Sequence, residues 1–169
     1  ITQQISPSSL SLRRIVYVGS LKSDRGFDVI FNAISLLLSK RSDFSFHIFG
    51  DIDIFNSLMS NHSNRSSSHD ISRYVHCHGF LPRPQLLSQL SSFDIGLSAI
   101  PFESKFVEST PTKLIEYMGC GLAVIGSSGI PFLEDTINNY SCGLIVDFHF
   151  ISLCNGLNTL LDCSSKTLD

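Results

Sequence analysis

Short apolar runs alternate with helical patterns six times along this chain. Each run is five to seven residues long, and four of the six end at or beside a glycine. Apolar runs of this length are typical of strands that are buried on both faces of a parallel sheet. We therefore expect strands at residues 14–19, 44–50, 74–80, 94–100, 122–126 and 142–146.

The segments between these runs carry apolar residues at helical spacing, or the proline and glycine signals that begin and end helices. The clearest such segment covers residues 27–39, where one face holds Phe27, Ile30, Phe31, Ile34, Leu37 and Leu38. Further helices are expected at residues 54–59, 84–91, 130–136 and 150–161, and one that starts at Pro111. The serine-rich residues 60–72 are low in complexity and are expected to form a mobile surface loop.

This alternation predicts an α/β fold, a Rossmann-like doubly wound parallel six-stranded sheet with helices on both faces. The commonest order for six such strands is 3-2-1-4-5-6, in which the topology switches between strands 1 and 4. Ligands bind at that switch, outside the carboxyl ends of the strands. The two loops that meet there are residues 19–26 and 101–110.

The second of these loops leads into the stretch F-E-S-K-F-V-E-S-T-P-T-K-L-I-E-Y-M-G-C-G at residues 102–121. Thr110 is expected as the N-cap of a helix, with Pro111 at its first helical position and Gly119 and Gly121 at its end. Thr112 and Glu116 lie one turn apart on one face. A different, core-facing stripe is expected from Leu114, Ile115 and Met118.

Glu108 precedes this helix, and seven residues separate it from Glu116. The free N–H groups and the dipole at a helix start bind phosphate, whereas a carboxylate suits hydroxyl groups because it accepts two hydrogen bonds from a vicinal diol. A ligand with both features is a sugar nucleotide. The alternative is that both glutamates are solvated surface charges. The sugar-nucleotide interpretation is favoured because the topology nominates the same place independently.

The loop after the first strand carries Lys22 and Arg25 between Gly19 and Gly26. Glycine lets a backbone approach a ligand closely, and a cation there can neutralise a diphosphate. A plain surface turn with two solvated charges is the alternative. Neither the G-x-G-x-x-G nor the G-x-x-x-x-G-K-[ST] signature is present, which argues against a dinucleotide oxidoreductase and a P-loop enzyme.

Three other patterns are weaker candidates. Asp51 and Asp53 could clamp a metal ion, but they follow a strand where a polar turn is expected, and no third ligand is near in sequence. In the run His76-Cys77-His78, strand alternation puts the two histidines on one face and the cysteine on the other, so a structural role is favoured over a metal site. No G-x-S-x-G elbow supports a serine hydrolase.

The composition of the chain limits the class of protein and the number of domains. The chain has 169 residues and a net charge of −3, with no basic footprint for nucleic acid or an anionic membrane surface. Its five cysteines are odd in number and unpatterned, which indicates a reducing compartment and a cytoplasmic protein. We expect one domain at residues 14–163, with a linker at 1–13 and a tail at 164–169. No apolar run is long enough to span a bilayer, and the N-terminus does not read as a signal peptide.

The span from Arg14 to about Leu161 resembles the C-terminal, donor-binding domain of GT-B glycosyltransferases, family 4 in particular (glycosyl transferases group 1). The matching segments are YVGSLKSDRGFD, HIFGD, HCHGFLPRPQLLSQLSSFDIGLSAIPF and ESTPTKLIEYMGCGLAVIGSSGIPFLEDTINNYSCGLIVD. Glu108 and Glu116 form the E-x7-E element of that family. The form S/T-P-T-K-L-x-E-Y-M is frequent in bacterial polysaccharide enzymes.

The resemblance assigns roles to residues around the helix start. It implies that Glu116 hydrogen-bonds the ribose hydroxyls and that Glu108 contacts hydroxyls of the donor sugar. The backbone N–H groups of residues 109–112, which include Ser109, Thr110 and Thr112, are expected to hold the diphosphate. The base is expected near Phe80 and Leu81.

The resemblance also implies a cationic clamp around Gly19. Arg25 stands where the family usually has a lysine that neutralises the diphosphate leaving group. The family's other cation, directly after the strand-1 glycine, is Ser20 here. This departure weakens the clamp, and Lys22 or Lys113 is the candidate to compensate for it.

The implied reaction is transfer of a sugar from a nucleoside diphosphate sugar to a glycan or lipid-linked acceptor, with retention at the anomeric carbon and without a metal ion. It corresponds to a glycosyltransferase of the hexosyltransferase type. In the family the acceptor binds a second, N-terminal GT-B domain, which this sequence lacks. The isolated chain is therefore expected to bind donor weakly and to transfer little or nothing.

Two rival interpretations stay open. One is a non-catalytic nucleotide-binding or interaction module derived from such a domain, which Ser20 and the missing half favour. The other is a sugar-nucleotide epimerase of the same architecture, for which nothing in the sequence selects the catalytic acids. A peripheral association of the full enzyme with the inner face of a membrane also stays open.

Overall fold

The computed structural model describes residues 12–63, 71–103, 106 and 111–163. Within these residues, six strands form one parallel sheet in the order β3-β2-β1-β4-β5-β6. The fold class and strand order predicted from the sequence are confirmed, so β1 and β4 lie side by side at the switch in topology. The strands are β1 Arg13–Val18, β2 Phe44–Phe49, β3 Val75–Cys77, β4 Ile95–Ser98, β5 Ala123–Ser127 and β6 Gly143–Val146.

Each helix expected from the apolar spacing is present, with boundaries shifted by a few residues. The α-helices are α1 Phe27–Leu38, α2 Ile52–Ser63, α3 Arg83–Leu90, α5 Thr112–Gly119, α6 Pro131–Tyr140 and α7 Phe150–Asp162. Two short 3₁₀ helices, η1 Ser23–Arg25 and η2 Ile71–Arg73, lie in the connections. All six residues of the stripe predicted on α1 are buried.

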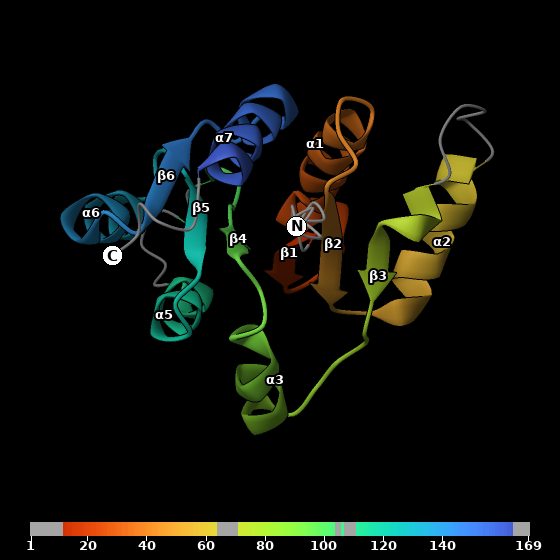
Figure 1. Cartoon of the computed structure of the whole chain (residues 1–169), viewed down its shortest axis with the longest axis horizontal. Coiled ribbons are helices and arrows are strands. Elements are labelled where there is room, and N and C mark those ends of the chain that lie inside the picture. Colours follow the sequence, from red (N-terminus) through yellow and green to blue (C-terminus); the bar gives the residue numbers. More distant parts are fainter. Residues whose placement is uncertain (1–11, 64–70, 104–105, 107–110, 164–169) are drawn as a thin grey trace, which may run out of the picture.

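Two apolar clusters, one on each face of the sheet, make up the core. On one face α1, α2 and α7 pack against side chains such as Ile15 and Phe46. On the other face α3, α5 and α6 pack against Val16 and Phe49. Figure 1 shows this arrangement, with α1 beside α7 and with α3 and α5 on the opposite side of the sheet.

The segment 52–72 differs most from expectation. Helix α2, Ile52–Ser63, extends beyond the predicted residues 54–59 at both ends. Its earlier start is explained by Asp51, whose Oδ1 accepts hydrogen bonds from the N–H groups of Asp53 at 3.0 Å and Ile54 at 3.1 Å. The prediction of a loop over residues 60–72 is wrong at both ends, since α2 continues to Ser63 and η2 begins at Ile71. Residues 64–70 lie outside the described part of the chain.

No helix in the described ranges is both long and apolar enough to cross a membrane.

Candidate functional site

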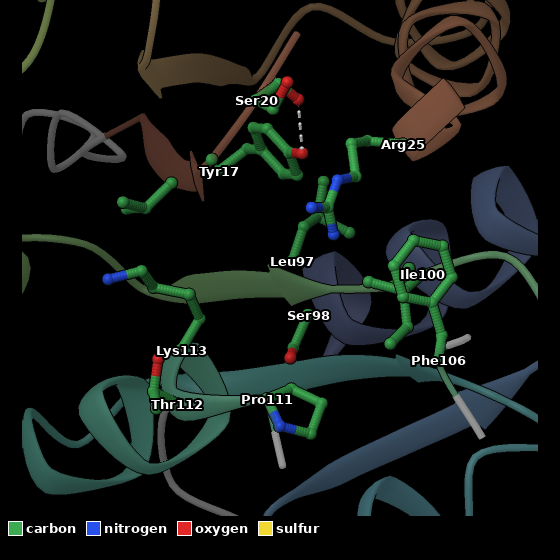
Figure 2. A pocket seen from close by; sticks show the side chains of 13 residues that line it. Tyr17, Ser20, Arg25, Leu97, Ser98, Ile100, Phe106, Pro111, Thr112 and Lys113 are labelled. Carbon is green, nitrogen blue, oxygen red and sulfur yellow. Dashed lines mark hydrogen bonds between the residues drawn. The ribbon is translucent and has the colours of Figure 1, made fainter. Parts of the chain in front are cut away.

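A cavity of about 390 Å³ opens where the carboxyl ends of β1 and β4 meet the start of α5. It lies at the point where the strand order reverses, so the structure places a concave surface where the topology predicted one. Figure 2 shows side chains from β1, the following loop, β4 and α5 around it. Its lining is Tyr17, Val18, Gly19, Ser20, Arg25, Leu97, Ser98, Ala99, Ile100, Phe106, Pro111, Thr112 and Lys113.

The loop after β1 is anchored by two hydrogen bonds, one to the side chain of Tyr17 in β1 and one to the end of β2. The buried Tyr17 hydroxyl donates to the carbonyl of Ser20 at 2.8 Å, and the N–H of Gly19 donates to the carbonyl of Phe49 at 3.1 Å. Burial raises the pKa of Tyr17 to about 12, against the opposing effect of Arg25, so the hydroxyl keeps its proton and remains a donor. The two bonds hold Gly19 and Ser20, the first residues of the loop, against β1 and β2.

Gly26 ends η1 and starts α1 in a backbone conformation that requires glycine. Its φ is 72°, in the left-handed region, and a Cβ there would overlap the ring of Phe148. Arg25, directly before it, is exposed and places its guanidinium carbon 5.0 Å from the centroid of the Phe106 ring. Both side chains line the cavity, and Figure 2 shows the guanidinium of Arg25 pointing into it.

Helix α5 begins one residue later than the sequence predicted. Pro111 is the N-cap and not the first helical residue, and its carbonyl accepts the first helical hydrogen bond, from the N–H of Leu114 at 3.0 Å. Proline is tolerated there because it brings no N–H that needs a partner. The N–H groups of the first turn, at Thr112 and Lys113, have no partner within the helix, and both residues line the cavity. Thr110, expected as the N-cap, lies outside the described residues.

The buried face of α5 also differs from the predicted stripe. Ile115 is 50% exposed, whereas Leu114 and Tyr117 are fully buried and Glu116 is only 8% exposed. The prediction that Leu114, Ile115 and Met118 face the core is therefore wrong for Ile115. The reason is Tyr117, which takes the central core position: its ring lies over Gly96, where a Cβ would overlap it, and its hydroxyl accepts from the N–H of Val18 at 3.0 Å.

Glu116 is buried between two cations, although the sequence placed it on a face away from the core. Lys113 Nζ donates to its Oε2 at 2.6 Å, and Arg83 Nε lies 3.1 Å from its Oε1. These partners compensate the charge that burial would otherwise leave unpaired. Arg83 was not predicted, because it starts α3, a distant segment, and no local pattern links it to Glu116.

A second cavity, of about 430 Å³, adjoins the first. Both are lined by Val18, Gly19, Ser20 and Lys113, so they flank the same segment of the β1 loop. The second cavity is the more apolar of the two and holds the predicted base contacts Phe80 and Leu81. Its other lining residues are Leu21, Lys22, Phe49, Asp51, Ile54, Arg83 and Leu86.

The two cavities differ in charge. Among the described residues, the first is lined by two cations, Arg25 and Lys113, and by no carboxylate. With the start of α5 beside them, this lining suits an anion. The second is lined by the cations Lys22, Arg83 and Lys113, and by the carboxylate of Asp51. Glu116 is not among its lining residues, but it pairs with two of them, Arg83 and Lys113.

Neither weak metal candidate forms a ligand cluster: no group of three His, Cys, Asp or Glu residues in the described chain is placed to hold an ion. His76 and His78 share a face as the alternation predicted, and both rings lie near His47 of β2. His47 is hydrogen-bonded on both sides, to Ser45 Oγ through Nε2 at 2.9 Å and to His78 through Nδ1 at 2.9 Å. This cluster is a structural feature of the sheet face.

The sequence profile of glycosyl transferases group 1 matches residues 2–168. The chain belongs to this family. A search of curated proteins finds no match. The solved structures supply the comparison of folds.

The family fold is recognisable in structures of low sequence identity. The C-terminal domain of a glycosyl transferase group 1 protein (LpcC) from Francisella tularensis is 20% identical, with a TM-score of 0.70, over 92% of this chain and 78% of that one. A glycosyltransferase from Rickettsia africae ESF-5 is 22% identical, with a TM-score of 0.69, over 92% of this chain and 38% of that one. The chain thus spans most of an isolated C-terminal domain but well under half of the larger protein. Its fold is that of a GT-B C-terminal domain.

The structure brings together the family-like residues on both sides of the switch point. Gly19, Ser20, Arg25, Thr112 and Lys113 line the first cavity. Lys22 lines only the second cavity, whereas Lys113 lines both cavities. Of the two cations suggested to compensate for Ser20, Lys113 is therefore the one that lines the first cavity. Glu108 and Ser109 lie outside the described residues, as does Thr110. Sequence reasoning missed Tyr17, Arg83, Ser98, Phe106 and Tyr117.

Proposed function

We propose that this domain binds a nucleoside diphosphate sugar as the donor half of a retaining glycosyltransferase of GT-B family 4. The observation that carries the proposal is the pair of adjoining cavities. One has a cationic lining at a helix start, which suits a diphosphate. The other is the more apolar, which suits a base, and its lining includes Arg83 and Lys113, the two ion-pair partners of Glu116.

Among the similar structures, two bind ligands of this chemical class. An E. coli protein that is 16% identical, with a TM-score of 0.65, is bound to UDP-2-fluoro glucose. A pneumococcal O-GlcNAc transferase that is 15% identical, with a TM-score of 0.62, is in complex with UDP and GlcNAc. At this identity they support the fold, and the ligand class passes to the present chain only as part of the proposal.

In the proposed reaction the bond between the anomeric carbon and a diphosphate oxygen breaks, and negative charge grows on the diphosphate. Arg25, Lys113 and the first N–H groups of α5, whose residues line this cavity, are the donors that would stabilise this charge. These donors account for the leaving group without a metal ion. Glu116 would accept from the ribose hydroxyls, and Glu108 from hydroxyls of the sugar.

The acceptor is expected to bind an N-terminal GT-B domain that faces this one. We accordingly propose that the 169-residue chain alone binds donor weakly and does not transfer sugar. A robust transfer rate from this chain would contradict that. The second candidate function is a non-catalytic nucleotide-binding module. It is favoured by Ser20, because the cation expected at that position is absent and the ammonium group of Lys113, which would have to replace it, already pairs with Glu116.

Thermal unfolding with added UDP, GDP, ADP and the corresponding monophosphates tests the proposal. Binding to the folded state stabilises it by about 2.7 kcal/mol at a hundredfold excess of ligand over Kd. We expect one diphosphate to raise the unfolding temperature of the chain, and Glu116→Ala to abolish the rise. Ile115→Ala, at an exposed neighbouring position on α5, is the control that keeps it. If no diphosphate stabilises the chain at millimolar concentration, the donor-site proposal is wrong for this domain.

A further inference from the structure

Ser98, the last residue of β4, is a buried serine whose hydroxyl has no partner. Only 5% of the residue is exposed. In the described part of the chain, its Oγ is the one buried side-chain polar atom without a hydrogen bond. Buried polar groups in folded proteins are nearly always paired, so an exception needs a physical explanation.

Ser127, on the neighbouring strand β5, shows what a buried serine does elsewhere in this sheet. It is fully buried, and its Oγ donates to the carbonyl of Ile100 at 2.6 Å and accepts from the N–H of Ile100 at 3.0 Å. The two serines are close in the sheet, since Ser98 pairs in register with Gly126. The unpaired state is therefore particular to Ser98 and is not a property of this part of the core.

Ser98 lines the cationic cavity at its β4 wall. Figure 2 shows its hydroxyl on the side of Pro111, between β4 and the start of α5. The same cavity presents Arg25, Lys113 and the first turn of α5. Since the described lining offers donors and no carboxylate, the ligand atom that suits this surface is an anionic oxygen.

We propose that Ser98 is a phosphate-binding residue, whose O–H donates to a phosphate oxygen of the nucleoside diphosphate bound beside the start of α5. The inference rests on the proposed function and adds a residue to it that the resemblance did not indicate. An unpaired buried hydroxyl destabilises the free protein, and a ligand that supplies the acceptor removes that cost. Ser98 thus ties the stability of the fold to occupation of the site.

Ligand-dependent unfolding of the wild-type chain, Ser98→Ala and the matched control Ser127→Ala tests this, with UDP, GDP and ADP and the nucleosides uridine, guanosine and adenosine. For the diphosphate that binds tightest, we expect Ser98→Ala to weaken binding about tenfold, as for loss of one hydrogen bond to a charged acceptor. Nucleoside affinity is expected to stay unchanged. Without ligand, Ser98→Ala should unfold no earlier than wild type, whereas Ser127→Ala should unfold earlier, because it leaves Ile100 without its partner.

Two results would overturn the inference while leaving the proposed function intact. One is an unchanged diphosphate affinity in Ser98→Ala. The other is an equal loss of diphosphate and nucleoside affinity, together with an unfolding temperature as low as that of Ser127→Ala, which is the pattern of a structural hydroxyl. If the wild-type chain binds no diphosphate, the proposed function fails, and the role of Ser98 fails with it.

Discussion

The hydroxyl of Tyr117 accepts a hydrogen bond from the backbone N–H of Val18 at 3.0 Å, and this bond joins α5 to the end of β1. Burial is the main cause that raises the pKa of Tyr117 above its usual range, so the hydroxyl stays neutral. Its ring fills the space over Gly96. One side chain thereby sets the distance between the β1 loop and the helix start, the two elements that form the candidate site.

Tyr117→Phe removes this bond and keeps the ring. Because the N–H of Val18 then loses its partner, we expect the free energy of unfolding to fall by about 1–3 kcal/mol. We also expect weaker binding of nucleoside diphosphates, since α5 is no longer fixed to β1. Chemical denaturation and ligand-dependent unfolding measure the two effects. Tyr140→Phe, on an exposed tyrosine of α6, is the control, and equal stability of both variants would contradict the role of Tyr117.

Arg83→Met tests whether the arginine orients Glu116 toward a ribose. The wild-type chain should bind a nucleoside diphosphate more tightly than its 2′,3′-dideoxy form, which lacks the hydroxyls that Glu116 would contact. In Arg83→Met the ratio of the two affinities should fall toward one, mainly because the ribonucleotide binds more weakly. Arg73→Met, which removes an exposed arginine on η2, is the control for net charge. An equal loss for both nucleotides would show that Arg83 does not act through Glu116.

The histidine cluster predicts a loss of stability in mild acid. Burial, and then the neighbouring charges of Arg14, His76 and His78, lower the pKa of His47 to about 3. The folded state therefore resists protonation of a group that the unfolded chain protonates at about pH 6.5. The contribution of His47 to the free energy of unfolding is therefore fully present above about pH 6.5. As the pH is lowered further, this contribution decreases by up to about 1.4 kcal/mol per pH unit, until the folded-state pKa is reached.

His47→Gln should flatten this dependence between about pH 6.5 and pH 5, above the range in which most carboxylates titrate. Denaturant unfolding of both proteins at several pH values measures the two slopes. Parallel curves for wild type and variant would contradict the role of His47.

The sequence predicted the fold because the features that determine it are local. Apolar runs of strand length and helical stripes such as that of α1 fix the order of elements, and connection rules then fix the strand order. The start of α5 was predicted to within one residue from Pro111 and the glycines that follow. The position of the first cavity also follows from the strand order, because it lies where that order reverses.

The parts that could not be predicted depend on contacts between distant segments. Arg83 pairs with Glu116, although the two residues are 33 positions apart in the sequence. The burial of Glu116 follows from that partner and Lys113, not from the pattern of α5 itself. Ser98 is indistinguishable in sequence from any polar residue in an apolar strand, and only the absence of a partner in the described structure marks it.

The central claim is that a nucleoside diphosphate binds at the start of α5, between the loops after β1 and β4. Amide chemical-shift mapping of the 169-residue chain, titrated with the best-binding of UDP, GDP and ADP, tests it most directly. We predict that the largest shifts fall on Gly19, Ser20, Thr112 and Lys113, and that α7 is unaffected. Shifts that instead gather in the separate cavity between residues 101–103 and 147–148, or that spread without a focus, would contradict the account.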